Sequence, residues 1–296
     1  MKNKANNIDY QEFLNIGFIQ TNLDEKLAWF NIKTGKWNIP MSVTAQIKML
    51  QEIQQGFCDV VNYSNKPNFI ILPELTLPIP SEKELERLCI ASKAIVIAGL
   101  DFIRGKKGIQ NKAVIMVPSQ WPGVRKSRHV SKYYVGKTHF SIPEKELFSD
   151  IGLTEEPDQA TYLFHADIFG KIGIAICSDF FDLERFVIYR GKIQHLFVIS
   201  HNQDTESYYF LAEAISRLVF CNVVICNTGF YGDSIAFSPY DKSFKRYIYR
   251  HKGQDLFATQ VIKLPVRDLI EAQMLSPKKS NKSLFKAPPP GYKYSK

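Results

Sequence analysis

The sequence predicts a layered α/β domain in which the strands run in mixed directions. Short apolar runs rich in branched side chains alternate with longer segments whose apolar residues recur about every 3.6 residues. The first elements come in the order strand, helix, strand, helix, strand and strand, which favours a layered α/β fold. The chain has 296 residues, of which 45% are apolar, so it can bury a large core as one large domain or two small ones.

The first half of the chain supplies four strands and two helices. We expect the strands at 13–20, 69–72, 94–100 and 112–117, and the helices at 43–63 and 81–92. Ser81 and Glu84 have the spacing of a capping box at the start of the second helix. Cys58 falls inside the first helix, and we place its side chain in the core.

The second half continues the same alternation. We expect a hairpin of 162–169 with 172–176, helices at 182–190 and 206–220, and strands at 195–199, 222–227, 232–239 and 256–264. In the helix at 206–220, one apolar face is predicted from Leu211, Ala214, Ile215 and Leu218. Cys221 and Cys226 are expected to be core residues and not metal ligands.

The net charge of +9 is concentrated at one end of the chain. Residues 277–296 contain six lysines and no acid, which leaves only +3 for the rest. The same segment is rich in proline, so we expect it to bury little and to form an extended or disordered basic tail. The predicted organisation is therefore a domain at 1–276 followed by a Lys/Pro-rich tail at 277–296.

A second basic stretch, at 119–137, interleaves cations with aromatic residues. This pattern is found in proteins that bind single-stranded nucleic acid. An ordinary β-hairpin with a solvated face explains it equally well and is the interpretation we favour. A nucleic-acid or protein partner for the surface at 125–132 and for the tail stays open at this point.

Other classes of protein are not indicated. No apolar run approaches the length of a membrane span, and the polar N-terminus leads into no apolar signal segment, so we expect a cytoplasmic protein without a membrane partner. The five cysteines form no C-x-x-C pair, the six histidines are scattered, and no phosphate-binding glycine loop occurs. We therefore expect neither a metal nor another cofactor.

Three reactive side chains stand where predicted strands end. Glu74 follows the buried strand at 69–72, Lys137 follows the basic hairpin, and Cys177 follows the strand at 172–176. Each residue alone has an ordinary structural explanation. A thiol is nucleophilic only as the thiolate, and for that it needs a base or a nearby positive charge. Glu74 can serve as the base and Lys137 as the cation, so the three residues together indicate nucleophilic catalysis.

These residues and their surroundings resemble the nitrilase (carbon–nitrogen hydrolase) superfamily. The run at 69–74 is similar to the family's apolar strand ending in Pro-Glu, and the run at 133–140 to its lysine motif, with Phe140 in place of leucine. The run at 177–184 is similar to its cysteine elbow, C-x-D-x-x-x-x-E. Weaker similarities lie at Gln20, at Arg217 and at 232–234, so the resemblance runs from about residue 13 to residue 264.

The resemblance implies a fold and a set of roles. The fold is a four-layer α-β-β-α sandwich, two central mixed sheets flanked by helices, and it commonly pairs into homodimers. Cys177 is the implied nucleophile, Glu74 the base, and Lys137 the stabiliser of negative charge together with the backbone N–H of Ser178. The family also has a second glutamate after the lysine. Glu144 fits that place best, and Glu146 is the alternative.

The substrate is left open by the departures from the family pattern. Ser178 stands where an aromatic residue is common and Leu183 where proline is common, and the loop with His201 and Asn202 lacks the tryptophan of many amidases. We place Ser178, His201 and Asn202 in the substrate pocket. The expected activity is hydrolysis of a small non-peptide amide or nitrile through a cysteine thioester, and acyl transfer to another acceptor is not excluded. The alternative is an interaction module of the same fold that binds nucleic acid or a protein.

Overall fold

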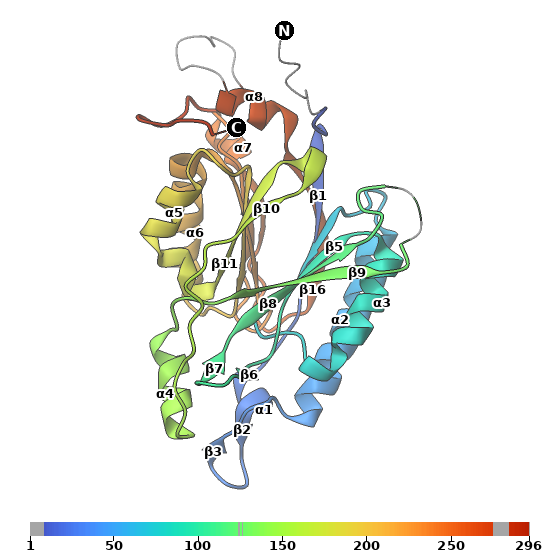
Figure 1. The fold of residues 1–296 in the computed structure, drawn as a ribbon, viewed down its shortest axis with the longest axis vertical. Helices are drawn as coiled ribbons and strands as arrows, with labels where there is room; N and C mark the ends of the chain where they lie inside the picture. Colours follow the sequence, from blue (N-terminus) through green and yellow to red (C-terminus); the bar gives the residue numbers. More distant parts are fainter. Residues whose placement is uncertain (1–8, 124, 126, 275–283, 296) are drawn as a thin grey trace.

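The computed structural model describes residues 9–123, 125, 127–274 and 284–295. Two six-stranded sheets pack face to face, and helices cover the outer face of each (Figure 1). The predicted α-β-β-α sandwich is therefore confirmed. Within the described residues, no helix is long and apolar enough to cross a membrane.

The first sheet has the strand order β16-β1-β4-β5-β8-β9. Its strands are β1 (Phe13–Gln20), β4 (Phe69–Ile71), β5 (Ile95–Gly99), β8 (Lys112–Pro118), β9 (Val130–Gly136) and β16 (Ala258–Pro265). β1, β4 and β5 are parallel, whereas β8 is antiparallel to β5 and β9 is antiparallel to β8. β9 therefore runs in the same direction as β4, and both end at the same edge of the sheet. The stretch 119–137, which we expected to form a hairpin by itself, instead supplies the connection and the second strand, β9, of a hairpin whose first strand is β8.

The second sheet has the order β10-β11-β12-β13-β14-β15. Its strands are β10 (Leu163–His165), β11 (Lys171–Ile176), β12 (His195–Ser200), β13 (Asn222–Asn227), β14 (Ser234–Phe237) and β15 (Tyr247–His251). β11, β12 and β13 are parallel, so the residues that follow β11 and β12 lie next to each other.

Helices cover the outer faces because each has one apolar stripe. The first sheet is covered by α2 (Val43–Asn62) and α3 (Glu82–Ser92), and the second by α5 (Leu183–Tyr189) and α6 (Thr205–Ile215). The remaining helices are α1 (Glu25–Trp29), α4 (Ile142–Asp150), α7 (Ser243–Arg246) and α8 (Arg267–Met274). Short helical turns lie at η1 (Ile79–Ser81), η2 (Asp167–Phe169), η3 (Cys177–Phe181) and η4 (Ser216–Phe220). Two small hairpins pair β2 (Phe30–Asn31) with β3 (Lys36–Trp37), and β6 (Ile103–Arg104) with β7 (Ile109–Gln110).

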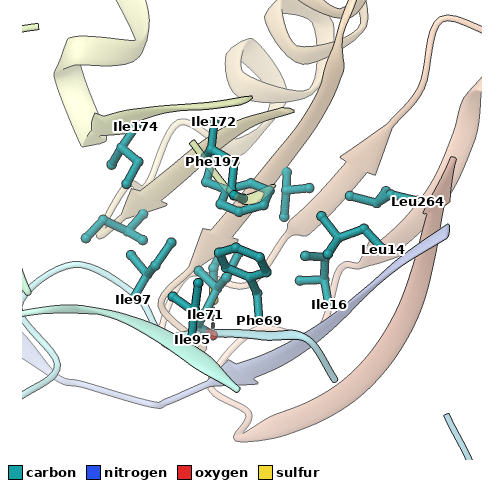
Figure 2. Close-up of a cluster of buried hydrophobic side chains, with 14 of the residues drawn as sticks. Leu14, Ile16, Phe69, Ile71, Ile95, Ile97, Ile172, Ile174, Phe197 and Leu264 are labelled. Carbon is teal, nitrogen blue, oxygen red and sulfur yellow. Dashed lines mark hydrogen bonds between the residues drawn. The ribbon is translucent and has the colours of Figure 1, made fainter. Parts of the chain in front are cut away.

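The main core lies between the two sheets (Figure 2). Phe69 of the first sheet meets Phe197 of the second, with 5.6 Å between the ring centroids. Ile71 and Ile97 on one side and Ile172 and Ile174 on the other belong to the same cluster. Burial of these branched side chains holds the sheets together and sets how closely the strand ends approach each other.

Several local expectations are wrong. Cys58 is exposed on α2 and is not a core residue. The Ser81 side chain accepts no capping hydrogen bond, because a helical turn already precedes α3. In the predicted helix at 206–220, α6 ends at Ile215 and continues as a wider π turn. The buried face is made by Tyr208, Ala212, Ile215 and Val219, whereas Ala214 and Leu218 of the predicted face are exposed.

The C-terminal segment packs against the domain more than expected. Phe285 is 2% exposed and stacks on Tyr240, with 4.7 Å between the ring centroids. The backbone N–H of Ser295 donates to the carbonyl of Gly191 at 2.7 Å. The expectation that the tail buries little is therefore wrong for residues 284–295, and the expected lysine-rich start of the tail, 277–283, lies outside the described residues. The helix α8 and the strand β15 were not predicted.

A buried histidine makes the fold sensitive to acid. His195 is fully buried at the start of β12, and burial lowers its pKa from 6.5 to about 4. Its ring bonds the Phe169 carbonyl at 2.9 Å and the Asn222 amide at 3.1 Å. Between pH 6.5 and 4, the unfolded chain therefore binds a proton that the folded chain does not, and stability must fall as the pH falls.

We predict that this histidine contributes about 1 kcal/mol per pH unit to the acid dependence of stability. His195→Gln should be less stable at pH 7, because it loses fitted hydrogen bonds, but its free energy of unfolding should depend less on pH between 6.5 and 5. Urea denaturation at several pH values measures this. The matched control is His165→Gln, at an exposed position of β10, which should keep the wild-type slope. Equal slopes for all three proteins would contradict the prediction.

Candidate active site

Three strand ends of the first sheet bring polar side chains to one edge. Glu74 follows β4 and Lys137 follows β9, and these strands run in the same direction. Asn111 precedes β8, which runs the opposite way, so its side chain reaches the same edge. The sheet topology thus gathers a carboxylate, an ammonium and an amide from segments far apart in the sequence.

The backbone at Glu74 depends on a glycine in the neighbouring strand. A side chain on Gly99 would place its Cβ 2.4 Å from the Cα of Glu74. The next residue, Leu75, has a φ of 60°, in the left-handed region. The chain therefore turns sharply after β4 and passes directly over the end of β5, which places the Glu74 side chain inside the protein, with 2% of its surface exposed.

Cys177 comes from the other sheet. It follows β11, it opens the helical turn η3, and its φ is 46°. A left-handed conformation costs a non-glycine residue about 1 kcal/mol or more. Such a turn at a strand end projects the thiol away from the sheet, as the sequence motif implied. The cysteine is 7% exposed.

The ammonium of Lys137 is held between two carboxylates. Its Nζ donates to Glu74 Oε1 at 2.8 Å and to Glu144 Oε2 at 2.7 Å, and the lysine is 1% exposed. Asn111 Nδ2 donates to the same two residues, at 2.8 Å to Glu74 and 3.0 Å to Glu144. Burial alone lowers the pKa of Lys137, but the charges of Glu144 and Glu74 outweigh it and raise the pKa well above 10.5. The lysine is therefore a permanent cation.

The resting cysteine is a neutral thiol. Burial, and then the negative charge of Glu74, raise its pKa to about 12, although Lys137 acts in the opposite direction. With both glutamates ionised, the cluster carries two negative charges and one positive charge. Loss of the thiol proton to water would add a further negative charge. Transfer of that proton to a carboxylate of the cluster, Glu74 or Glu144, leaves the total charge unchanged, so these two groups can accept it without adding charge to the site.

The second glutamate is Glu144 in this geometry. It lies in the first turn of α4, where Ser141 and Glu144 form a complete capping box. Burial acts to raise its pKa, but the charge and hydrogen bond of Lys137 lower it. Glu146 makes no contact with Lys137 among the described interactions; it is exposed and lines the mouth of the cavity described below.

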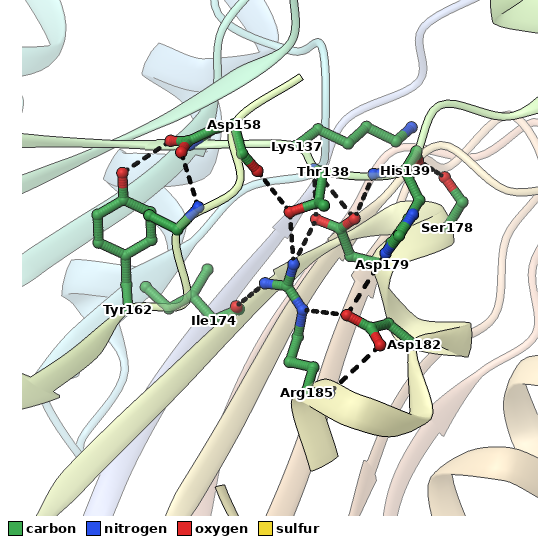
Figure 3. Close-up of polar contacts among 12 residues, drawn as sticks. Lys137, Thr138, His139, Asp158, Tyr162, Ile174, Ser178, Asp179, Asp182 and Arg185 are labelled. Atoms are coloured by element: carbon green, nitrogen blue, oxygen red, sulfur yellow. Dashed lines mark hydrogen bonds and ion pairs between the residues drawn. The ribbon is translucent and has the colours of Figure 1, made fainter. Parts of the chain in front are cut away.

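A separate ion-pair network holds the lysine loop against the cysteine turn (Figure 3). Asp179 accepts hydrogen bonds from the backbone N–H groups of Thr138 at 3.1 Å and His139 at 2.8 Å. Arg185 lies 3.5 Å from Asp179 and donates to the Thr138 hydroxyl at 2.8 Å. The third residue of the elbow therefore positions the residues that follow Lys137. The Ser178 hydroxyl donates to the His139 carbonyl.

A cavity of about 410 Å³ lies beside these groups. Glu74, Lys137, Glu144 and Cys177 line it, as do His201 and Asn202 from the loop after β12. The backbone N–H of His201 donates to Glu74 Oε2 at 2.9 Å, so this loop also fixes the second oxygen of the base. Ser178 is not among the lining residues, because its side chain is bound to the His139 carbonyl.

Solved structures with the same architecture are known, although the sequence matches no protein-family model and no curated protein sequence. A CN-hydrolase superfamily protein from Xanthomonas campestris, with an arsenic adduct in its active site, superposes with a TM-score of 0.60 at 11% identity, covering 89% of this chain and 94% of that one. Nit3 of Saccharomyces cerevisiae, a member of branch 10 of the nitrilase superfamily, gives 0.61 at 15% identity, covering 92% and 98%.

The chain has the nitrilase-superfamily fold. A variant of the amidase from Nesterenkonia sp. AN1 gives a TM-score of 0.62 at 12% identity, covering 88% of this chain and 94% of that one. In that structure, the acetamide moiety of fluoroacetamide is covalently added at the active-site cysteine. At these identities the comparison establishes the nitrilase fold, whereas the roles of Glu74, Lys137 and Cys177 rest on the geometry of this chain.

Three parts of this nitrilase-fold site were missed in the sequence. Asn111 stands outside the three motifs, and only the antiparallel entry of β8 brings it between the glutamates. Glu25, in the unpredicted helix α1, accepts a hydrogen bond from His201 Nε2 at 3.0 Å. Tyr208 is buried beside the cysteine turn, with its ring 5.3 Å from that of Phe180. The sequence held a clue to two of them. Asp24 is a helix-start signal before Glu25, and Tyr208 lies on the buried face of α6, which the sequence analysis assigned wrongly.

We predict that Glu74→Gln lowers the pKa of Cys177. The variant removes the charge that most raises this pKa after burial, whereas Lys137 keeps acting in the opposite direction. Thiolate absorbance at 240 nm, followed against pH with Cys177→Ala as the blank, should show the thiol ionising at lower pH in the variant. Glu146→Gln is the matched control and should leave the titration unchanged. An unchanged or higher pKa in Glu74→Gln would show that Glu74 does not act on the thiol.

Proposed function

We propose that this chain hydrolyses a carbon–nitrogen bond of a small non-peptide amide or nitrile through a thioester on Cys177. The observation that carries the proposal is the buried cluster in which Lys137 lies 2.8 Å from Glu74 and 2.7 Å from Glu144, beside the cysteine in one cavity. Burying a cation between two carboxylates costs free energy, and an apolar core that serves only stability avoids this cost. Its position beside a neutral thiol supports a catalytic role.

The first half of the reaction on an amide forms the thioester. The sulfur of Cys177 attacks the carbonyl carbon while the thiol proton passes to Glu74. The negative charge that develops on the substrate oxygen is stabilised by the ammonium of Lys137 and the backbone N–H of Ser178. When the carbon–nitrogen bond breaks, Glu74 returns the proton to the nitrogen, and ammonia or an amine leaves.

The second half consumes water. Glu74, again a carboxylate, takes a proton from a water molecule as its oxygen attacks the thioester carbon. The carbon–sulfur bond breaks, the proton returns to the sulfur, and a carboxylic acid is released. Glu144 keeps Lys137 oriented in both halves, because it holds the ammonium through a second hydrogen bond. The sum is amide plus water giving acid plus ammonia or amine.

The exposed apolar residues of α5 and α6 support the homodimer that the sequence resemblance implies. Leu183 and Val187 of α5 and Phe210 of α6 are 70%, 74% and 66% exposed. These two helices lie side by side on the outer face of the second sheet (Figure 1). An apolar patch of this kind is typical of a surface that another chain covers.

We predict that Cys177→Ala abolishes amide turnover without loss of the fold. Ammonia release from a panel of short primary amides should fall by at least about a thousandfold, because no other group of the cluster can form the covalent intermediate. The thermal midpoint should stay within a few degrees of the wild type, since the change removes a single sulfur atom at the edge of the core.

The control is Cys58→Ala, which changes an exposed cysteine on α2 and should keep full turnover. An active Cys177→Ala protein would contradict the proposed nucleophile. A wild-type protein that releases ammonia from no amide and converts no nitrile would contradict the proposed reaction.

A further inference from the structure

The wall of the active-site cavity is strongly acidic. Besides Glu74 and Glu144, which hold Lys137, four more carboxylates line it: Glu25, Glu146, Asp150 and Asp204. Among the residues that the structure describes, Lys137 is the only lysine or arginine in the lining. With the glutamates and aspartates ionised and the thiol neutral, the lining carries six negative charges and one positive charge. The whole chain, by contrast, has a net charge of +9, so this concentration of acid is a local feature of the cavity.

The four outer carboxylates have no permanent cation of their own. In the described part of the chain, no lysine or arginine forms an ion pair with Glu25, Glu146, Asp150 or Asp204. Glu146 and Asp150 lie one turn apart on α4 and are exposed at the mouth. Like charges four residues apart repel each other on a helix. They leave an uncompensated negative potential at the entrance.

A buried histidine holds one of these carboxylates in place and favours its ionised form. The His201 side chain is 4% exposed, and its Nε2 lies 3.0 Å from Glu25 Oε1, which also accepts from the Tyr231 hydroxyl at 3.0 Å. The hydrogen bond from His201, more than any other contact, lowers the pKa of Glu25. An ionised carboxylate cannot donate, so Nε2 carries a hydrogen. The other ring nitrogen, Nδ1, is buried and has no hydrogen-bond partner among the described residues.

Aromatic rings complete the lining. Trp29, Trp37 and Tyr231 line the same cavity, and the His201 ring is packed edge-on against Trp29 and Tyr231. Ring faces attract cations, and ammonium or guanidinium groups are bound by such rings together with carboxylates. Carboxylates without a lysine or arginine partner among the described residues, together with aromatic rings, suit one kind of group, which is a cation with N–H donors.

We infer that the substrate is an amide whose far end carries an ammonium or guanidinium group. This inference rests on the proposed function for the reacting end of the molecule, and it adds the recognition of the other end. A carboxylate at the far end of the substrate is repelled, because Lys137 is already bound by two glutamates and the remaining wall is negative. The cavity volume of about 410 Å³ accommodates a chain of a few methylene groups between the two ends.

The experiment compares three amides of equal chain length that differ only in the terminal group. They are 5-aminopentanamide, which ends in an ammonium, hexanamide, which ends in a methyl, and 5-carbamoylpentanoate, which ends in a carboxylate. For the wild-type protein, kcat/KM should rank ammonium above methyl above carboxylate, with about tenfold or more between the first two. Added salt should reduce the difference, because the outer carboxylates are exposed.

A matched pair of variants tests which residues recognise the terminal ammonium of the substrate. Glu146→Gln combined with Asp150→Asn should reduce several-fold the ratio of kcat/KM for 5-aminopentanamide to kcat/KM for hexanamide. Glu271→Gln, which removes an exposed carboxylate of α8 outside the cavity lining, should leave this ratio unchanged. An equal preference for the methyl and ammonium compounds in the wild type, or a preference for the carboxylate, would overturn the inference while leaving the proposed hydrolysis intact.

Binding separates this inference from the reaction. Calorimetric titration of Cys177→Ala with the same three amides measures recognition without turnover. Tighter binding of 5-aminopentanamide than of hexanamide supports the cationic substrate even if the wild-type protein hydrolyses none of the three, a result that would count against the proposed function alone. Equal binding of the three amides, or no binding, would overturn the inference whatever the outcome of the activity assay.

Discussion

An ammonium group buried in a protein must be compensated, because its transfer from water costs several kcal/mol even after the structure relaxes. Lys137 meets this demand with two carboxylates, one from the end of β4 and one from the first turn of α4. The lysine therefore fixes the position of three segments at once. Asn111 bonds the same two carboxylates and limits their movement. With Glu74 as the proton acceptor, as we propose, transfer of the thiol proton leaves the net charge of the buried site unchanged.

The nucleophile belongs to the opposite sheet, so the site also depends on how the two sheets meet. Their apolar faces determine the spacing, with Phe69 and Phe197 in contact at its centre. Polar connections also cross from one sheet to the other, and two of them reach the site directly. Asp179 of the cysteine turn accepts from the backbone after Lys137, and Glu74 accepts from the backbone N–H of His201. Cys177, Glu74 and Lys137 are thus held together by several contacts, and these contacts also involve backbone groups and neighbouring side chains.

The sequence predicted the alternation of strands and helices and the three residues at the strand ends, because buried strands and reactive side chains after them leave local signals. It did not predict what depends on pairing across the fold. Asn111 bonds both glutamates only because β8 is antiparallel. Glu25 and His201 are far apart in the sequence, and only the fold brings them into contact. The exposed Cys58 and the face of α6 were assigned wrongly because more than one set of side chains on a helix has the right spacing. Only packing against the sheet decides which set is buried. Phe285 was assigned to a tail that buries little, because the lysines and prolines around it predict an exposed segment. Its aromatic side chain nevertheless packs on Tyr240.

The central claim is that Cys177 carries the acyl group of an amide during turnover. The most direct measurement is the mass of the intact protein after turnover is stopped with acid within seconds of mixing with a short amide, followed by peptide mapping. The account predicts a mass increase equal to the amide minus ammonia, located on the peptide that contains Cys177 and absent from Cys177→Ala. Consumption of the amide with an unmodified Cys177, or an acyl group on another residue, would contradict it.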